Sequence, residues 1–431
     1  MPDISKSGFV EQEFFLSGSS GSLPYKTRIV VRRPAAAKDF SGTVVVDWIN
    51  VTGGTDLETL WPPAVPMYLR EGHAYVGLTA QAVGVNGLRA WDPVRYGSLV
   101  HPGDTPHSYT ILAQAIQALR SPKGVRPMGR LNVERVIVGG SSQSAGRLVS
   151  YISEGYPITG HIDGFWISRA GGGSEIANTA RKLRVPIIHS FEEGLAAQPP
   201  NNRFYRVWEG AGQAHAPKSW HDYVWQVYQR DLWSNAADLP NPLDGGCAMN
   251  RGTVQYQIRA GLHRLHEWLV DGTRAPLAPR ITRDAEGDQV RDADGNVLGG
   301  LRYPFVDVPL ATNSSSGCPL FGSHRAWSQE KIVKRYRTHA AYYAKVEASV
   351  DRLRSGGFLQ PYDARTILRQ AARFNVWGKA GSCYDTSNRN ADETGAVSGA
   401  LHGARNERST VGFGAPAAVG EVSCNFAALG L

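Results

Sequence analysis

The sequence predicts an α/β fold with one mostly parallel, eight-stranded sheet and helices on both of its faces. Three observations lead to this prediction. Apolar segments bounded by turn residues recur eight times before residue 210, and segments able to form helices separate them from the third onward. Such alternation is typical of a parallel sheet that is covered on both faces. The third observation is a strand, a sharp turn and a helix in direct succession at residues 135–154.

The expected strands are short and rich in β-branched and aromatic residues. In order, they are Glu11–Leu16, Thr27–Arg32, Thr43–Ile49, Ala74–Thr79, Arg135–Gly139, Gly164–Ser168, Pro186–Phe191 and Phe204–Trp208. The turn SGSSGS joins the first two, which predicts an antiparallel hairpin. The clearest expected helices are Ser108–Arg120, Ala145–Glu154, Ser174–Leu183 and Thr253–Asp271.

The pattern changes after about residue 275. The segment RDAEGDQVRDADGNVLGG predicts tight turns between short strands. Its D-x-D-G-N motif lacks the ligand spacing of an EF-hand calcium loop. A helical region, Ser328–Gly356, and a tail rich in Gly, Ser and Asn follow. We therefore divide the chain into a catalytic domain, residues 1–275, and a C-terminal extension, residues 276–431, that packs on or caps it.

Composition narrows the possible partners. The chain has 431 residues and a formal net charge of +8, but it has no dense Lys and Arg run that predicts nucleic-acid binding. Its apolar stretches are strand-sized, so no membrane span is expected, and no signal peptide is visible at the N-terminus. We expect a soluble protein that is either cytoplasmic or exported after processing. The sequence does not determine its oligomeric state.

Four cysteines, Cys247, Cys318, Cys383 and Cys424, lie in the C-terminal part without any C-x-x-C pair. This spacing argues against a zinc or redox motif, and it leaves disulfides and buried free thiols equally open. No metal or organic cofactor is expected.

The strongest motif is RVIVGGSSQSAGRLVSYI, in which a strand runs into a Gly/Ser turn and then a helix. A nucleophile elbow requires this context, and it requires small residues two positions on either side of the serine. Gly140 and Ser144 meet that need around Ser142. A second frame would make Ser144 the nucleophile, but it places the bulky Arg147 where close helix packing is wanted. We favour Ser142.

A serine nucleophile needs a base and an acid to orient that base. His215 follows the last expected strand in a Gly-rich loop, and His221 is its only serious rival. The strand before it ends in SFEEG, so Glu192 and Glu193 are the candidate acids. We lean towards Glu193.

The oxyanion of an acyl-transfer intermediate needs preorganised N–H donors. The backbone of Gln143, directly after the nucleophile, is one candidate. The loop after the third strand, DWINVTGG, offers Asn50 and Val51 for the other.

The elbow text VGGSSQSAGRL resembles bacterial alpha/beta hydrolase domain proteins, whose elbow reads like G-E-S-Q-S-A-G-R-L. Further similar stretches are VDWINVTGG, GLTAQAVGV, DPVRYGSLVHPGD, RVWEGAGQAHA and LGGLRYPFVDVPLAT, so the resemblance covers most of the chain. It implies the α/β-hydrolase fold and a serine esterase-like activity, with Ser142 and His215 in the roles given above. The family has a T-E-T-D-like stretch where this chain has SFEEG. Because of this difference, the resemblance does not decide between Glu192 and Glu193 as the triad acid.

We therefore expect a serine hydrolase that cleaves a carboxylic ester-type bond of a small molecule through an acyl-enzyme. An acyltransferase, thioesterase, lactonase or amidase would use the same triad, and a non-catalytic hydrolase-like binding module is the alternative of another class. Aromatic residues after His215, from Trp220 to Trp233, either line an acyl pocket or pack against the extension.

Overall fold

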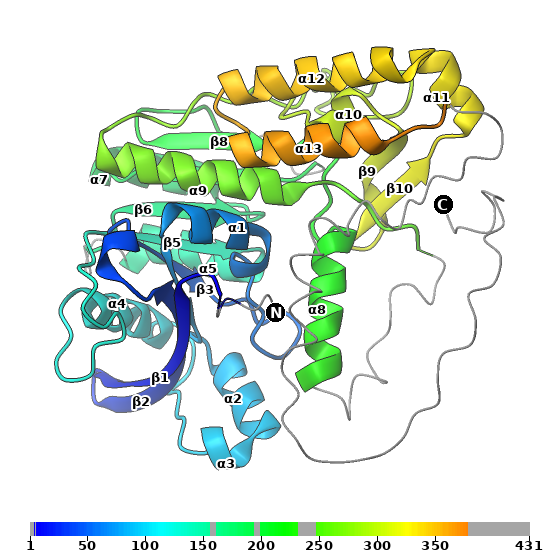
Figure 1. Ribbon diagram of the computed structural model, residues 1–431. Coiled ribbons are helices and arrows are strands. Elements are labelled where there is room, and N and C mark those ends of the chain that lie inside the picture. The colour runs from blue at the N-terminus through cyan, green and yellow to red at the C-terminus, as the bar shows by residue number, and fades with distance from the viewer. Residues whose placement is uncertain (1–3, 5, 156–160, 194–198, 232–246, 378–431) are drawn as a thin grey trace, which may run out of the picture.

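A computed structural model describes residue 4 and residues 6–155, 161–193, 199–231 and 247–377 of the chain (Figure 1). Its main feature is an eight-stranded sheet with the spatial order β1-β2-β4-β3-β5-β6-β7-β8. The strands are β1 (Phe9–Ser20), β2 (Leu23–Pro34), β3 (Thr43–Trp48), β4 (Ala74–Leu78), β5 (Arg135–Ser141), β6 (Gly164–Ser168), β7 (Ile187–Phe191) and β8 (Tyr205–Glu209). All eight predicted strands are present.

The sheet combines an antiparallel hairpin with a parallel part, as the sequence predicts. β1 and β2 form an antiparallel hairpin, β2 runs antiparallel to β4, and every pair from β4 to β8 is parallel. The carboxyl ends of the parallel strands therefore meet at one edge of the sheet, where ligands bind in open α/β sheets.

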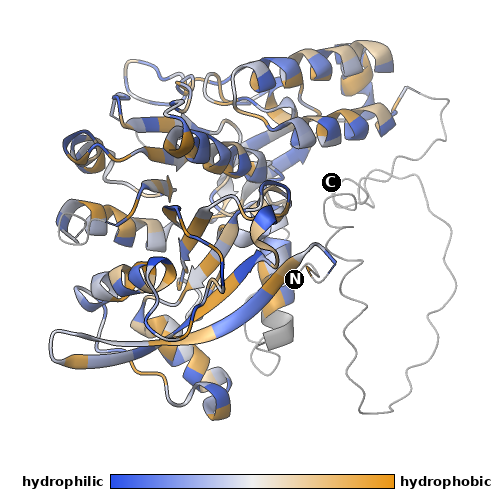
Figure 2. Cartoon of the chain, turned by 60° about the vertical axis from the view of Figure 1, so that its left-hand side comes forward, coloured by the Kyte–Doolittle hydropathy of each residue, from blue (hydrophilic) through white to orange (hydrophobic). Residues whose placement is uncertain are grey.

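Helices cover both faces of this sheet, and Figure 2 shows polar and apolar residues mixed around these helices. One face carries α1 (Trp61–Glu71) and α9 (Val254–Val270), and the other carries α4 (His107–Arg120), α5 (Gln143–Ser150) and α7 (Gly173–Leu183). Shorter elements are a 3₁₀ turn (Ala37–Asp39), α2 (Ala82–Trp91), α3 (Pro93–Tyr96) and a π-helical turn (Tyr151–Gly155) that continues α5. Helix α8 (Lys218–Asp231) follows the last strand.

The alternation of side chains along each strand explains the two covered faces. Val45 and Ile137 pack in the cluster that contains α1 and α9, whereas their neighbours Val44 and Val136 pack with α4, α5 and α7. Both sets are fully buried, so the central strands are apolar on both sides. This burial holds the ends of β5 to β8 in fixed positions.

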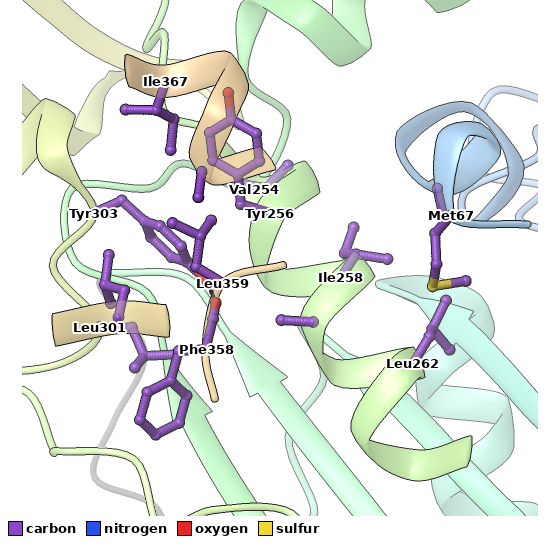
Figure 3. Close-up of a cluster of buried hydrophobic side chains, with 14 of the residues drawn as sticks. Met67, Val254, Tyr256, Ile258, Leu262, Leu301, Tyr303, Phe358, Leu359 and Ile367 are labelled. Atoms are coloured by element: carbon purple, nitrogen blue, oxygen red, sulfur yellow. Dashed lines mark hydrogen bonds between the residues drawn. The ribbon is translucent and has the colours of Figure 1, made fainter. Parts of the chain in front are cut away.

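The C-terminal part adds a layer outside α9. It contains α10 (Pro304–Asp307), β9 (Ala311–Cys318), β10 (Gly322–Ala326), α11 (Gln329–Tyr336), α12 (His339–Ser355) and α13 (Pro361–Arg373). In Figure 1, α12 and α13 lie above α9. Figure 3 shows Tyr256 and Ile258 of α9 in the same cluster as Tyr303, Phe358 and Ile367.

A buried ion pair also crosses this junction: Arg259 of α9 reaches Asp363 of α13 at 2.6 Å between Nη1 and Oδ1. The extension and the sheet thus share one buried cluster. The division at residue 275 stays a prediction.

Some details of the C-terminal part differ from expectation. The predicted helical region breaks at Arg337, whose φ of 65° ends α11, and Thr338 then caps α12 by accepting from the Ala341 N–H. Helix α13 was not predicted. The D-x-D-G-N piece forms a tight turn in which the Asp292 carboxylate accepts from the Asn296 N–H at 2.9 Å.

Cys247 and Cys318 form a disulfide. Cys383 and Cys424 lie outside the described residues. None of the helices in the described ranges is long and apolar enough to cross a membrane.

Candidate active site

The turn between β5 and α5 holds Ser142 in a strained backbone conformation. Its φ is 59° and its ψ is −120°, a region that a residue with a Cβ rarely occupies. Such strain costs about 1–3 kcal/mol and persists only where the surroundings enforce it. Here the Ser142 N–H donates to the Ser168 carbonyl at the end of β6, at 2.8 Å, and α5 begins at the next residue.

Close packing explains the small residues on either side of Ser142. A Cβ at Gly140 would lie 3.0 Å from the Ser144 hydroxyl and 3.1 Å from the backbone nitrogen of Ala145. Ser144 is fully buried, and its hydroxyl both donates to the Ser141 carbonyl and accepts from the Ser141 N–H, each at 3.0 Å. Its hydroxyl is therefore committed to the turn, whereas Ser142 remains partly exposed.

His215 lies in the loop after β8 and connects Ser142 to a carboxylate. Its Nε2 is 2.8 Å from the Ser142 hydroxyl, and its Nδ1 is 2.6 Å from Oε1 of Glu192. In the neutral ring, Nδ1–H donates to the carboxylate and Nε2 accepts from the hydroxyl, which is the arrangement that a general base requires. Glu192 directly follows β7, and its side chain is only 6% exposed.

The other candidate histidines lie elsewhere. His221 is in α8, stacked on Trp225, and its Nδ1 is 3.4 Å from Oδ1 of Asp222. His189 is fully buried in β7, where Tyr205 and the Ala170 carbonyl occupy its two ring nitrogens.

Glu193 does not face the histidine, which corrects the preference drawn from the sequence. Its Oε2 accepts from the Gly212 N–H at 2.9 Å, and its Oε1 pairs with Arg291 of the C-terminal part. Glu193 therefore braces the loop that carries His215, while Glu192 reaches the imidazole. Local sequence does not show this division, because Gly212 and Arg291 are distant along the chain.

Of the three candidate oxyanion donors, one uses its backbone N–H within the fold and two do not. The backbone N–H of Asn50 donates to the Leu57 carbonyl at 3.1 Å, and its side-chain amide donates to the Ser141 carbonyl at 2.8 Å. Asn50 thus supports the elbow from β3 instead of offering its backbone N–H. No described residue accepts from the backbone N–H of Gln143 or Val51, so both remain candidates.

Gln81, which sequence reasoning did not identify, fixes the side chain of Gln143. The two amides donate to each other, at 3.2 Å and 2.5 Å, and Gln81 is almost fully buried after β4. This reciprocal pair ties the start of α5 to the segment after β4, and β3 lies between β4 and β5 in the sheet. Two signals could have identified it: Gln81 lies three residues after β4 at the same sheet edge, and it belongs to the family-like stretch GLTAQAVGV.

The described part of α8 places aromatic side chains next to this edge. Trp220, Tyr223 and Trp225 are partly exposed, and the Tyr223 hydroxyl lies 3.5 Å from Oε2 of Glu58. The side chain of Tyr228 and all of Trp233 lie outside the described residues. A separate cavity of about 130 Å³ lies among α9, α12 and α13, and none of Ser142, His215 and Glu192 lines it.

Metal binding has no visible site in the described ranges, since no three His, Cys, Asp or Glu side chains there are grouped as ligands.

Comparisons with known proteins address the family. No curated protein matches the sequence. Similar solved structures include the esterase Est22, with 13% identity over 44% of this chain and a TM-score of 0.30. They also include a cold-adapted esterase from an Arctic intertidal metagenomic library, with 14% identity over 44% of this chain and a TM-score of 0.28.

The aligned part spans 65% of Est22 and 74% of the cold-adapted esterase. At these scores, the structural likeness carries no argument about activity. The family model described as alpha/beta hydrolase domain is more informative, because it matches residues 1–369 of the 431. Together with the eight-stranded sheet and the helices that cover it in the structure, this match confirms the α/β-hydrolase fold. The chain belongs to the alpha/beta hydrolase domain family.

Proposed function

We propose that the protein is a serine esterase that hydrolyses carboxylic esters of small molecules through an acyl-enzyme. The observation that carries the proposal is the hydrogen-bonded chain from Ser142 through His215 to Glu192, with distances of 2.8 Å and 2.6 Å. Glu192 replaces Glu193 as the acid, because only Glu192 reaches the imidazole.

The first step is attack of the Ser142 hydroxyl oxygen on the ester carbonyl carbon. His215 accepts the hydroxyl proton at Nε2, and Glu192 stabilises the imidazolium that forms. The negative charge moves to the carbonyl oxygen, for which the N–H groups of Gln143 and Val51 are the proposed donors. Collapse of this intermediate breaks the ester bond, and His215 gives its proton to the departing alcohol.

Water completes the cycle in the second step. His215 takes a proton from the water, the hydroxide oxygen bonds to the acyl carbon, and Ser142 leaves with the proton returned from His215. The products are one carboxylic acid and one alcohol. Partial exposure of both Ser142 and His215 keeps the site open to substrate and water.

Hydrolysis of short-chain p-nitrophenyl esters by wild type, Ser142→Ala and Ser144→Ala tests this function. We expect Ser142→Ala to lose at least about 10³-fold in kcat, because removal of the nucleophile removes the acyl-enzyme route. Ser144→Ala is the matched control, since it removes a hydroxyl from the same turn. Full activity in Ser142→Ala, or no turnover by wild type, would contradict the proposal.

A further inference from the structure

Arg169 lies at the same edge of the sheet as the proposed triad, and nothing in the mechanism above uses it. It directly follows β6, whose last residue, Ser168, pairs in register with Ser141 of β5. The Ser168 carbonyl accepts from the Ser142 N–H, and the Arg169 N–H donates to the Ser190 carbonyl of β7 at 2.9 Å. The backbone of Arg169 therefore lies between the nucleophile on one strand and the strand that carries Glu192.

The backbone of Arg169 is held in an unfavourable conformation. Its φ is 63°, in the left-handed region that a branched or long side chain seldom adopts. The next residue is fixed as well, because Nε2 of the buried His189 lies 2.8 Å from the Ala170 carbonyl. Burial lowers the pKa of His189 to about 3, so the ring is neutral and Nε2–H donates this bond. Strain that is enforced by surrounding hydrogen bonds is typical of functional positions.

The guanidinium of Arg169 has no described hydrogen-bond acceptor. Within residues 4, 6–155, 161–193, 199–231 and 247–377, no carboxylate, carbonyl or hydroxyl oxygen accepts from it, and no carboxylate lies within ion-pairing distance. Its side chain is partly buried, and burial lowers its pKa, while the charge of Glu192 acts in the opposite direction. Oε1 of Glu192 bonds His215, and its buried Oε2 has no hydrogen-bond partner among the described residues, so neither oxygen pairs with the guanidinium.

The charge of Glu192 offsets part of the cost of burying this cation, but a partly buried guanidinium without a hydrogen-bonded carboxylate stays costly unless a ligand supplies one. The guanidinium fork matches a carboxylate with two parallel N–H···O bonds, which makes arginine the usual residue for this recognition.

We propose that Arg169 binds a carboxylate of the substrate, so that the enzyme prefers esters that carry a second, free carboxylate. This inference rests on the proposed esterase function and names its substrate class. Arg169 is then a specificity-determining residue that contacts the substrate away from the ester bond. The carboxylate can belong to the acyl part or to the alcohol part of the ester, and the two pairs below cover both positions.

Two matched ester pairs test the preference. In each pair a carboxylate replaces a neutral amide: 4-acetoxybenzoate against 4-acetoxybenzamide, and monomethyl glutarate against methyl glutaramate. We expect wild type to show a higher kcat/KM for the charged member of at least one pair. Arg169→Gln should lower the ratio of charged to neutral kcat/KM at least tenfold, because it removes a charge-assisted bidentate contact. Arg169→Lys should give an intermediate ratio.

Arg184 provides the matched control. It is an exposed arginine at the end of α7 with a φ of 61°, close to that of Arg169. Arg184→Gln should leave the ratio unchanged. A parallel loss on both members of each pair in Arg169→Gln would overturn the proposal, and it would mean that Arg169 acts through Glu192. Equal use of charged and neutral esters by wild type would also overturn it.

A labelling experiment separates this inference from the esterase function itself. Benzoate should slow fluorophosphonate labelling of wild type more than benzamide does, and this difference should disappear in Arg169→Gln. Labelling of Ser142 with equal protection by the two compounds would overturn the carboxylate site alone. No labelling and no ester turnover would overturn the esterase function and the carboxylate site together.

Discussion

Replacement of Glu192 by Gln tests which of two adjacent carboxylates serves the triad. The substitution keeps the shape of the side chain and removes its charge. Glu192 is 6% exposed and contacts Nδ1 of His215 at 2.6 Å, so it interacts with the imidazolium that forms during attack. At a charge separation of about 4 Å and an effective dielectric constant of about 20, this attraction is about 4 kcal/mol. Since about 1.4 kcal/mol corresponds to tenfold in rate, kcat should fall about 10³-fold.

Glu193→Gln is the matched control, and its effect should fall on stability. Glu193 is buried, but its partner Arg291 is 33% exposed and can be hydrated once the ion pair is lost. We expect a loss of about 1–3 kcal/mol in the free energy of unfolding, with kcat within about tenfold of wild type. Steady-state hydrolysis of p-nitrophenyl acetate gives kcat, and urea unfolding gives stability. A 10³-fold loss in Glu193→Gln with near-normal Glu192→Gln would refute this assignment.

Three further predictions concern stability. Burial lowers the pKa of His189 to about 3 in the folded protein, whereas the His189 ring of the unfolded chain binds a proton below about pH 6.5. The free energy of unfolding therefore falls as the pH drops from about 6.5 towards 3. The loss should reach about 2 kcal/mol at pH 5, and His189→Gln should lack this part of the pH dependence in urea titrations. Gly261→Ala should lower the free energy of unfolding by at least about 1–3 kcal/mol, because the added Cβ on α9 would lie 2.0 Å from Cζ3 of Trp166 in the sheet. An unchanged melting temperature would contradict this packing. Reduction of the Cys247–Cys318 disulfide, which links residues 71 apart, should cost up to about 4 kcal/mol, and equal unfolding midpoints with and without reductant would contradict it.

The sequence was most informative where a single local pattern determines the structure. Apolar runs bounded by turn residues located every strand of the main sheet, and the small residues around Ser142 predicted the elbow. Helix α1 was not predicted because its text, WPPAVPMYLRE, contains three prolines. Two of them lie in the first turn, where a helix needs no backbone N–H, so they are tolerated there.

The site assignments that the sequence left open or missed depend on contacts between distant segments. Glu192 and Glu193 are neighbours, and the partner of each is set by Gly212, His215 and Arg291, which come from other elements. Arg169 had one usable signal, because it directly follows a strand that ends at the same edge as Ser142. The alternation rule ends where the strand ends, so it does not predict the direction of these side chains.

Fluorophosphonate labelling followed by peptide mapping tests whether Ser142 is an activated nucleophile. The compound reacts with a serine whose hydroxyl is deprotonated by a neighbouring base, so the label should appear on Ser142 in wild type and disappear in Ser142→Ala. His215→Ala should slow the labelling strongly, because the base is lost, whereas Ser144→Ala should still be labelled on Ser142. A label on Ser144, or ester hydrolysis that persists without any label on Ser142, would contradict the proposed triad.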